Sequence, residues 1–173
     1  RIALCRCPSG RDRDNHNAVH TGYIMAKAEA WRLEAGNYPV SIIIPPRYAD
    51  LDTLGHINNV ALAAMFETAR VHFHHLLGHH PSDSGVRWLV AAVDLKYVAE
   101  AHFPYDVAIY SGIGRIGNSS WTLYSAAFQQ GECVATCDTV MVLHGPKGSR
   151  VIDSHVRAVM ESNMAAPAVV AAE

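Results

Sequence analysis

The chain has 173 residues, of which half are hydrophobic and 17% are charged, and its formal net charge is −2 at pH 7. This length fits one globular domain, and this composition excludes a disordered chain. The near-neutral charge argues against a general nucleic-acid binder, and no apolar run reaches the ~20 residues that a membrane-spanning helix needs. The four cysteines show neither a disulfide framework nor a zinc spacing, so we expect a reducing, cytoplasmic setting.

The beginning of the chain has little periodic structure. Residues 1–24 carry four arginines among polar and turn-forming residues, and we expect a partly disordered extension, with Met25 as a candidate natural start. Residues 26–33 are rich in helix formers and predict a short amphipathic helix that stops near Gly36. The β-branched run at residues 40–44 then predicts a strand.

A polar turn over residues 47–59 separates this strand from a helix. Two carboxylates two positions apart, Asp50 and Asp52, precede a glycine, a histidine and two asparagines. Polar residues of several chemical kinds are thus concentrated where the chain must turn. This concentration makes the turn the candidate active site.

The segment after the turn predicts the most regular helix of the chain. Apolar residues recur at steps of three and four, at Leu62, Phe66, Ala69, Phe73 and Leu76/Leu77, so they share one helical face. Asn58 or Asn59 is a suitable N-cap, and Gly78 is a suitable terminator after the last turn. We therefore expect a helix that ends near Leu77.

Four strand-like runs follow, at residues 88–98, 107–116, 121–129 and 133–143. Tight-turn residues at 117–118 and 130–131 indicate antiparallel pairing, and we expect the four runs to form a meander. A short helix is predicted near residues 153–162. One apolar helix is buried best if the sheet curls around it, so the predicted class is an α+β domain. The expected division is an extension over 1–36, the domain over 37–163 and a tail over 164–173.

The motif of the turn resembles that of the hotdog-fold thioesterases, in the branch of 4-hydroxybenzoyl-CoA thioesterase and the acyl-ACP thioesterases. The matching residues are Arg47, Tyr48, Asp50, Asp52, Gly55, His56, Asn58 and Asn59, followed on the helix by Phe66, Glu67 and Arg70. The resemblance covers residues 40–143. It implies a hotdog fold, in which an antiparallel sheet wraps a long central helix.

The same resemblance implies a function. Members of this family hydrolyse acyl-CoA or acyl-carrier-protein thioesters without a metal or redox cofactor. They form homodimers, often dimers of dimers, with active sites at the dimer interface. We expect an acyl-CoA thioesterase with no nucleic-acid or membrane partner. The alternatives are an acyl-ACP thioesterase and a non-catalytic acyl-CoA-binding hotdog protein.

Three residues are candidate catalysts. By its position in the motif Asp52 is the expected catalytic carboxylate, as nucleophile or as general base, although an Asx-turn would also explain it. His56 matches a histidine of acyl-ACP thioesterases, but their asparagine two positions earlier is Leu54 here, so His56 is either catalytic or turn-stabilising. Glu67 is either a second catalytic carboxylate or the ion-pair partner of Arg70 or Arg47.

The start of the helix offers candidate donors for the oxyanion of the thioester carbonyl, because helix N-termini expose unpaired amides. The expected oxyanion and substrate-binding residues are Gly55, Asn58, Asn59, Val60 and Ala61. No metal site is expected. His75 and His79 have helical i, i+4 spacing, but no carboxylate or cysteine completes a ligand set.

Overall fold

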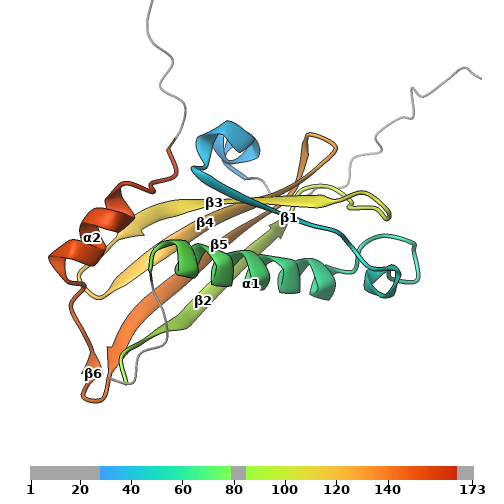
Figure 1. Ribbon diagram of the computed structural model, residues 1–173. Coiled ribbons are helices and arrows are strands. Elements are labelled where there is room, and N and C mark those ends of the chain that lie inside the picture. The colour runs from blue at the N-terminus through green and yellow to red at the C-terminus, as the bar shows by residue number, and fades with distance from the viewer. Residues whose placement is uncertain (1–27, 79–84, 167–173) are drawn as a thin grey trace, which may run out of the picture.

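A long helix, α1 (Asn59–Leu76), lies along one face of a curled antiparallel sheet (Figure 1). This computed structural model describes residues 28–78 and 85–166. The sheet contains β1 (Val40–Ile44), β2 (Arg87–Tyr97), β3 (Val107–Ile116), β4 (Ser120–Gln129), β5 (Glu132–Gly145) and β6 (Gly148–Ser149). The remaining elements are η1 (Ala30–Leu33), η2 (Ala35–Asn37), η3 (Tyr48–Asp50) and α2 (Ser154–Glu161). The predicted α+β hotdog arrangement is confirmed.

Local chemistry sets both ends of α1 as predicted. The side chain of Asn58 accepts a hydrogen bond from the amide of Val60 and caps the first turn. Gly78 follows the helix with φ +72°, a left-handed conformation that glycine adopts without steric cost. These two residues therefore fix where the helix begins and ends.

One face of α1 is buried against the sheet in two clusters. Near the N-terminal end, Phe66 packs with Ile109, and near the C-terminal end Phe73 packs with Trp121. Each large side chain buried in this way contributes roughly 1.5–3 kcal/mol to folding. The helix is therefore anchored to the sheet at both of its ends.

The strand order is β1-β3-β4-β5-β2, with every pairing antiparallel. The tight turns between β3 and β4 and between β4 and β5 are confirmed. The predicted meander of four consecutive strands is wrong at its first step, because β2 pairs with β5 and not with β3. The connection over residues 98–106 lacks a tight-turn signal, and β1 occupies the place beside β3 where β2 was expected.

The other face of the sheet is covered by η1 and η2. The helix predicted over residues 26–33 is, within the described residues, the single 3₁₀ turn η1. Its buried Arg32 reaches the sheet, where its Nη2 donates to Asp138 Oδ1 of β5 at 2.7 Å. Its Nε donates to the hydroxyl of Tyr38, just after η2, at 2.9 Å. The guanidinium lies 4.2 Å from the centre of the Tyr124 ring. A buried charge thus anchors this segment to the domain.

Candidate functional site

The turn before α1 begins with an arginine–aspartate clamp. The carboxylate of the buried Asp50 accepts the backbone amide of Arg47 at 2.7 Å and the guanidinium Nη2 of the same residue at 2.7 Å. The hydrogen bonds from the Arg47 side chain, and to a smaller extent the hydrogen bond from its backbone amide, hold the pKa of Asp50 below its ordinary value. Asp50 therefore stabilises the turn, and its oxygens are occupied by protein donors.

Asp52 closes a small ring of hydrogen bonds at the tip of the turn. Its Oδ1 accepts the amides of Leu54 at 2.8 Å and His56 at 3.1 Å, while its own amide donates to the His56 carbonyl at 2.9 Å. Gly55 takes φ +84° in this ring, and its amide donates to the Asp52 carbonyl at 3.2 Å. The Asx-turn, which the sequence offered as the alternative role of Asp52, is therefore present.

These contacts set the charge of Asp52. Burial acts to raise the pKa of Asp52, but the hydrogen bonds from the Leu54 and His56 amides and the nearby His56 outweigh burial and lower it. The carboxylate is consequently ionised at neutral pH and held in one orientation. A fixed anionic carboxylate can act as a nucleophile towards a carbonyl carbon.

The N-terminus of α1, which directly follows the polar turn, supplies further amides. The amide of Asn58 donates to the Asp50 carbonyl at 2.7 Å, and the amide of Val60 donates to Asn58 Oδ1 at 2.8 Å. The first amides of a helix have no intrahelical carbonyl partner. Of the expected oxyanion donors, the amides of Asn59 and Ala61 are therefore the best suited to a substrate oxygen.

His56 faces two residues that the sequence analysis did not single out. Its Nε2 lies 3.3 Å from Glu100 Oε2, and the His102 Nε2 lies 3.8 Å from the same oxygen. The two imidazole rings meet edge to face with centroids 5.0 Å apart. Glu100 and His102 alternate along one extended segment, which places them on one side of it, but the sequence gives no sign that this side faces residue 56.

Glu67 lies further along α1, outside the polar turn. It is two turns into α1, about 12 Å along the helix axis from Asn59. Its Oε2 lies 2.8 Å from Arg70 Nη2. The ion pair with Arg70, which was the alternative role of Glu67, is therefore present. The structure therefore brings Asp52 and His56 together in the turn that leads into α1, and it pairs Glu67 with Arg70 further along the helix.

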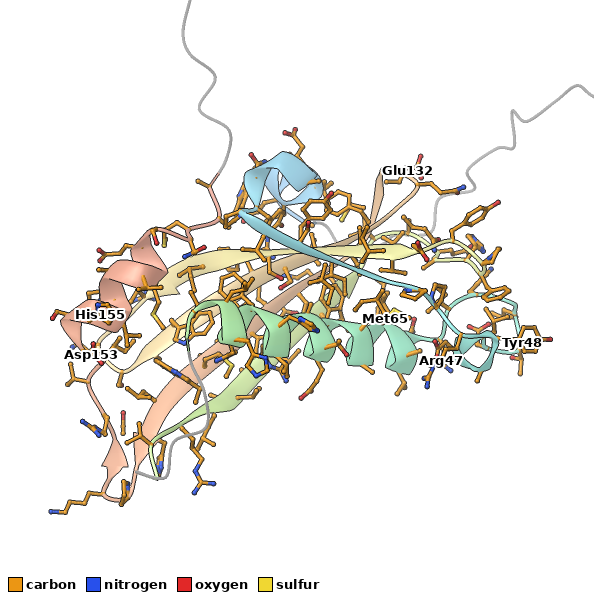
Figure 2. The ribbon with its side chains drawn as sticks, in the orientation of Figure 1. Arg47, Tyr48, Met65, Glu132, Asp153 and His155 are labelled. Atoms are coloured by element: carbon orange, nitrogen blue, oxygen red, sulfur yellow. The ribbon has the colours of Figure 1, made fainter. Side chains whose placement is uncertain are left out.

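A cleft of about 640 Å³ opens towards the other end of α1. It is lined by Glu67 and Arg70, by Trp88 of β2 and by Asp153 just before α2, but by no residue of the polar turn. Figure 2 shows this separation, with Arg47 at one end of the molecule and Asp153 at the other. The cleft is thus a place where Glu67, but not Asp52, could meet a ligand.

The two described cysteines offer no competing nucleophile. Cys137 is buried and Cys133 is half-buried in β5, and both are free thiols. Burial raises the pKa of Cys133 to about 11 and also raises that of Cys137. Both therefore remain protonated at neutral pH, which suits the small core residues that the sequence predicts.

Comparison with known proteins gives a family match over most of the chain. Residues 46–163 match the family model described as the thioesterase-like superfamily, and the match begins at the polar turn. No curated protein matches the chain significantly.

Solved structures from several bacteria share the fold. The PA5185 protein from Pseudomonas aeruginosa is 26% identical, with a TM-score of 0.69 over 76% of this chain and 96% of that chain. A predicted thioesterase from Bacillus stearothermophilus is 28% identical, with a TM-score of 0.66 over 72% of this chain and 95% of that one. A thioesterase from Thermus thermophilus, solved with coenzyme A and Zn, is 23% identical, with a TM-score of 0.65 over 73% of this chain and 94% of that one.

Proposed function

We propose that this chain, which belongs to the thioesterase-like superfamily, hydrolyses the thioester of an acyl-coenzyme A at the polar turn before α1. Thioester hydrolysis is the activity of the superfamily, and Asp52 is our proposed catalytic carboxylate. The observation that carries the proposal is the ionised Asp52 carboxylate, fixed by two backbone amides in the turn that leads into α1. Among the described residues no helix is both long and apolar enough to cross a membrane.

The proposed chemistry begins at the thioester carbonyl carbon. As a nucleophile, an Asp52 oxygen bonds to this carbon and coenzyme A leaves as a thiolate; water then hydrolyses the mixed anhydride and restores the carboxylate. As a general base, Asp52 takes a proton from the water that attacks the same carbon. A pKa below the ordinary value keeps Asp52 in the anionic form that both routes require.

The amides of Asn59 and Ala61 are the proposed oxyanion donors. When the carbonyl carbon is attacked, its oxygen becomes negative, and the positive end of the helix dipole favours that charge. In this proposal His56 supports the turn through its backbone, and its ring is the proton donor to the leaving sulfur. Glu67 is proposed to stabilise α1 through Arg70.

The surroundings of the turn support coenzyme A over an acyl carrier protein as the carrier of the acyl group. Tyr48, Leu54 and Val60 are each more than three-quarters exposed around the turn, and Tyr48 packs edge to face on Phe103. An acidic carrier protein would need a basic surface, but the cation of this turn, Arg47, is paired with Asp50. Leu54 also stands where acyl-ACP thioesterases carry their supporting asparagine.

A substrate comparison tests the proposal. The wild-type chain is given short, long and aromatic acyl-CoAs, and the same acyl groups on a carrier protein, with release of free thiol as the signal. We expect at least one acyl-CoA to be hydrolysed with a kcat/KM at least about tenfold above its carrier-protein counterpart, or about 1.4 kcal/mol in transition-state free energy. Preference for the carrier protein would identify an acyl-ACP thioesterase, and binding of acyl-CoA without turnover would identify a binding protein.

We further propose that the chain forms a homodimer through the edge strand β2. Only one side of β2 pairs within the described part of the chain, with β5, and apolar side chains along it are exposed, including Val93 at 53%. A long, exposed apolar edge strand promotes association with another chain, which then covers it. Pairing of two β2 strands would continue the sheet across two copies, and this dimer is the unit from which a dimer of dimers would form.

The opposite edge of the sheet provides a matched control for the dimer. We expect Val93→Asp to shift the sedimentation coefficient of the wild-type dimer towards that of the monomer, because it places a charge in the buried interface. Ile43→Asp, at a comparably exposed apolar site on β1, is expected to leave the dimer intact. Dissociation by Ile43→Asp alone would place the interface on β1 and contradict the proposal.

A further inference from the structure

We propose that His56, Glu100 and His102 form a binding site for a divalent transition-metal ion, with Zn²⁺ as the best chemical match. One ligand atom from each of the three residues lies within 4.8 Å of the other two. Two imidazoles and a carboxylate are a donor set that zinc uses when three protein residues bind it. The site shares His56 with the proposed catalytic turn, but metal binding can be measured without thioester hydrolysis.

Two of the three ligand separations are close to those around a bound ion. Two ligands that are each 2.0–2.1 Å from a tetrahedral zinc ion are about 3.4 Å apart. The separation from Glu100 Oε2 to His56 Nε2 is 3.3 Å, and that to His102 Nε2 is 3.8 Å. The third separation, between the ligand atoms of the two imidazoles, is within 4.8 Å, so a bound ion requires the two rings to approach each other by up to about 1.4 Å. Rotation of the half-exposed Glu100 and His102 side chains can supply this movement.

The donor chemistry selects the class of ion. Imidazole is a preferred ligand of zinc, copper, nickel and iron, whereas Mg²⁺ and Ca²⁺ prefer a shell of oxygen atoms. With three protein ligands, a tetrahedral ion retains one position for water or another small ligand. Glu100 and His102 are half exposed, so solvent can reach that position.

The backbone holds the two histidines in place without help from their rings. The backbone amide and carbonyl of His56 are hydrogen-bonded to Asp52. His56 also forms an isolated antiparallel β-bridge with His102. The amide and carbonyl of His102 bind the side chain of the buried Gln129, at 2.7 and 2.8 Å. Truncating the His102 ring leaves these backbone bonds in place, so its effect on metal binding can be measured on a folded protein.

A bound ion would join the polar turn to the connection between β2 and β3. His56 belongs to the ring of hydrogen bonds around Asp52, and Glu100 and His102 belong to the connection between β2 and β3. Coordination through Nε2 would occupy the proton-donating atom of the His56 ring. The ion would consequently both hold the two segments together and remove His56 from any proton transfer.

Calorimetric titration of the metal-stripped full chain with Zn²⁺ tests the site. We expect one strong site in the wild type, and no comparable binding of Mg²⁺ in the same buffer. Loss of groups that merely support a ligand lowers metal affinity 10- to 100-fold, so we expect His102→Ala and Glu100→Gln each to lower Zn²⁺ affinity by about 100-fold or more. Circular dichroism and the Tm of each metal-free variant confirm that it is folded.

Two other histidines provide controls. His155 lies in α2 at the far end of the molecule from the polar turn (Figure 2), and His75 lies in the histidine-rich end of α1. We expect His155→Ala and His75→Ala to keep the wild-type affinity within about threefold. Wild-type affinity in both His102→Ala and Glu100→Gln would overturn the proposal, as would the absence of strong Zn²⁺ binding by the wild type. Loss of binding in His75→Ala alone would move the site to the end of α1 and likewise contradict the proposal.

Discussion

Replacing Asp52 with asparagine is expected to lower kcat for acyl-CoA hydrolysis by on the order of 10²-fold or more. The asparagine oxygen can still accept the amides of Leu54 and His56, so the turn keeps its hydrogen bonds. The neutral carboxamide, however, can neither attack the thioester carbon nor take a proton from water. Steady-state release of free thiol gives kcat, and a binding titration with acyl-CoA establishes that affinity is retained.

The neighbouring carboxylate separates chemistry from structure. Asp50→Asn keeps the shape of the side chain but removes the charge that pairs with Arg47, so we expect it to lower Tm more than Asp52→Asn does. Its effect on kcat should be smaller than that of Asp52→Asn at a temperature where both variants are folded. Full activity of Asp52→Asn would limit Asp52 to its role in the Asx-turn.

Replacing Asp138 with alanine is expected to lower the free energy of unfolding by about 3 kcal/mol. The change leaves the guanidinium of Arg32, which is 5% exposed, without its charged partner. An unpaired buried charge is much more costly than the pair itself is favourable. Urea denaturation followed by circular dichroism measures the change, and an unaltered slope with denaturant would show that the unfolding transition is otherwise the same.

The opposite replacement is the matched control. Arg32→Met leaves Asp138, whose side chain is 29% exposed and can be hydrated, and it fills the space of the arginine with an apolar chain. We therefore expect Arg32→Met to cost less than Asp138→Ala, because no buried charge remains. Equal or greater destabilisation by Arg32→Met would show that packing of the arginine on Tyr124, and not its charge, anchors η1.

Local patterns in the sequence were sufficient to predict most elements. The N-cap at Asn58, the terminator at Gly78 and the apolar steps between them depend on neighbours within one or two turns, so α1 could be placed closely. The alternation of apolar residues in β3 and β4 likewise depends on one face of the sheet being buried. Each of these signals is contained within the element that it predicts.

The features that could not be predicted depend on contacts between distant segments. The place of β2 beside β5 depends on how the connection over residues 98–106 crosses the domain, which no short pattern encodes. The pairing of Arg32 with Asp138 spans 106 positions. The segment that contains Arg32 therefore gave only a local helix signal, and its packing on the outer face of the sheet was not expected.

The candidate site likewise has a part that the sequence predicts and a part that it does not. The motif indicated Asp52 through its position, and local hydrogen bonds explain why Asp50 has a different role. The meeting of His56 with Glu100 and His102 arises from a bridge between two loops, and the spacing of the histidines along the chain does not indicate it. A search for short metal motifs was bound to miss this cluster, because its members come from both sides of α1 and β2.

The central claim is that Asp52, and not Glu67, is the carboxylate that carries thioester hydrolysis. Both are accessible to ligands, Asp52 at the polar turn and Glu67 at the distant cleft. The most direct test is kcat for one acyl-CoA measured in parallel with wild type, Asp52→Asn and Glu67→Gln. Our account predicts a loss of about 10²-fold or more in Asp52→Asn and a change within about threefold in Glu67→Gln. The reverse order of losses would contradict it and place the chemistry at the cleft.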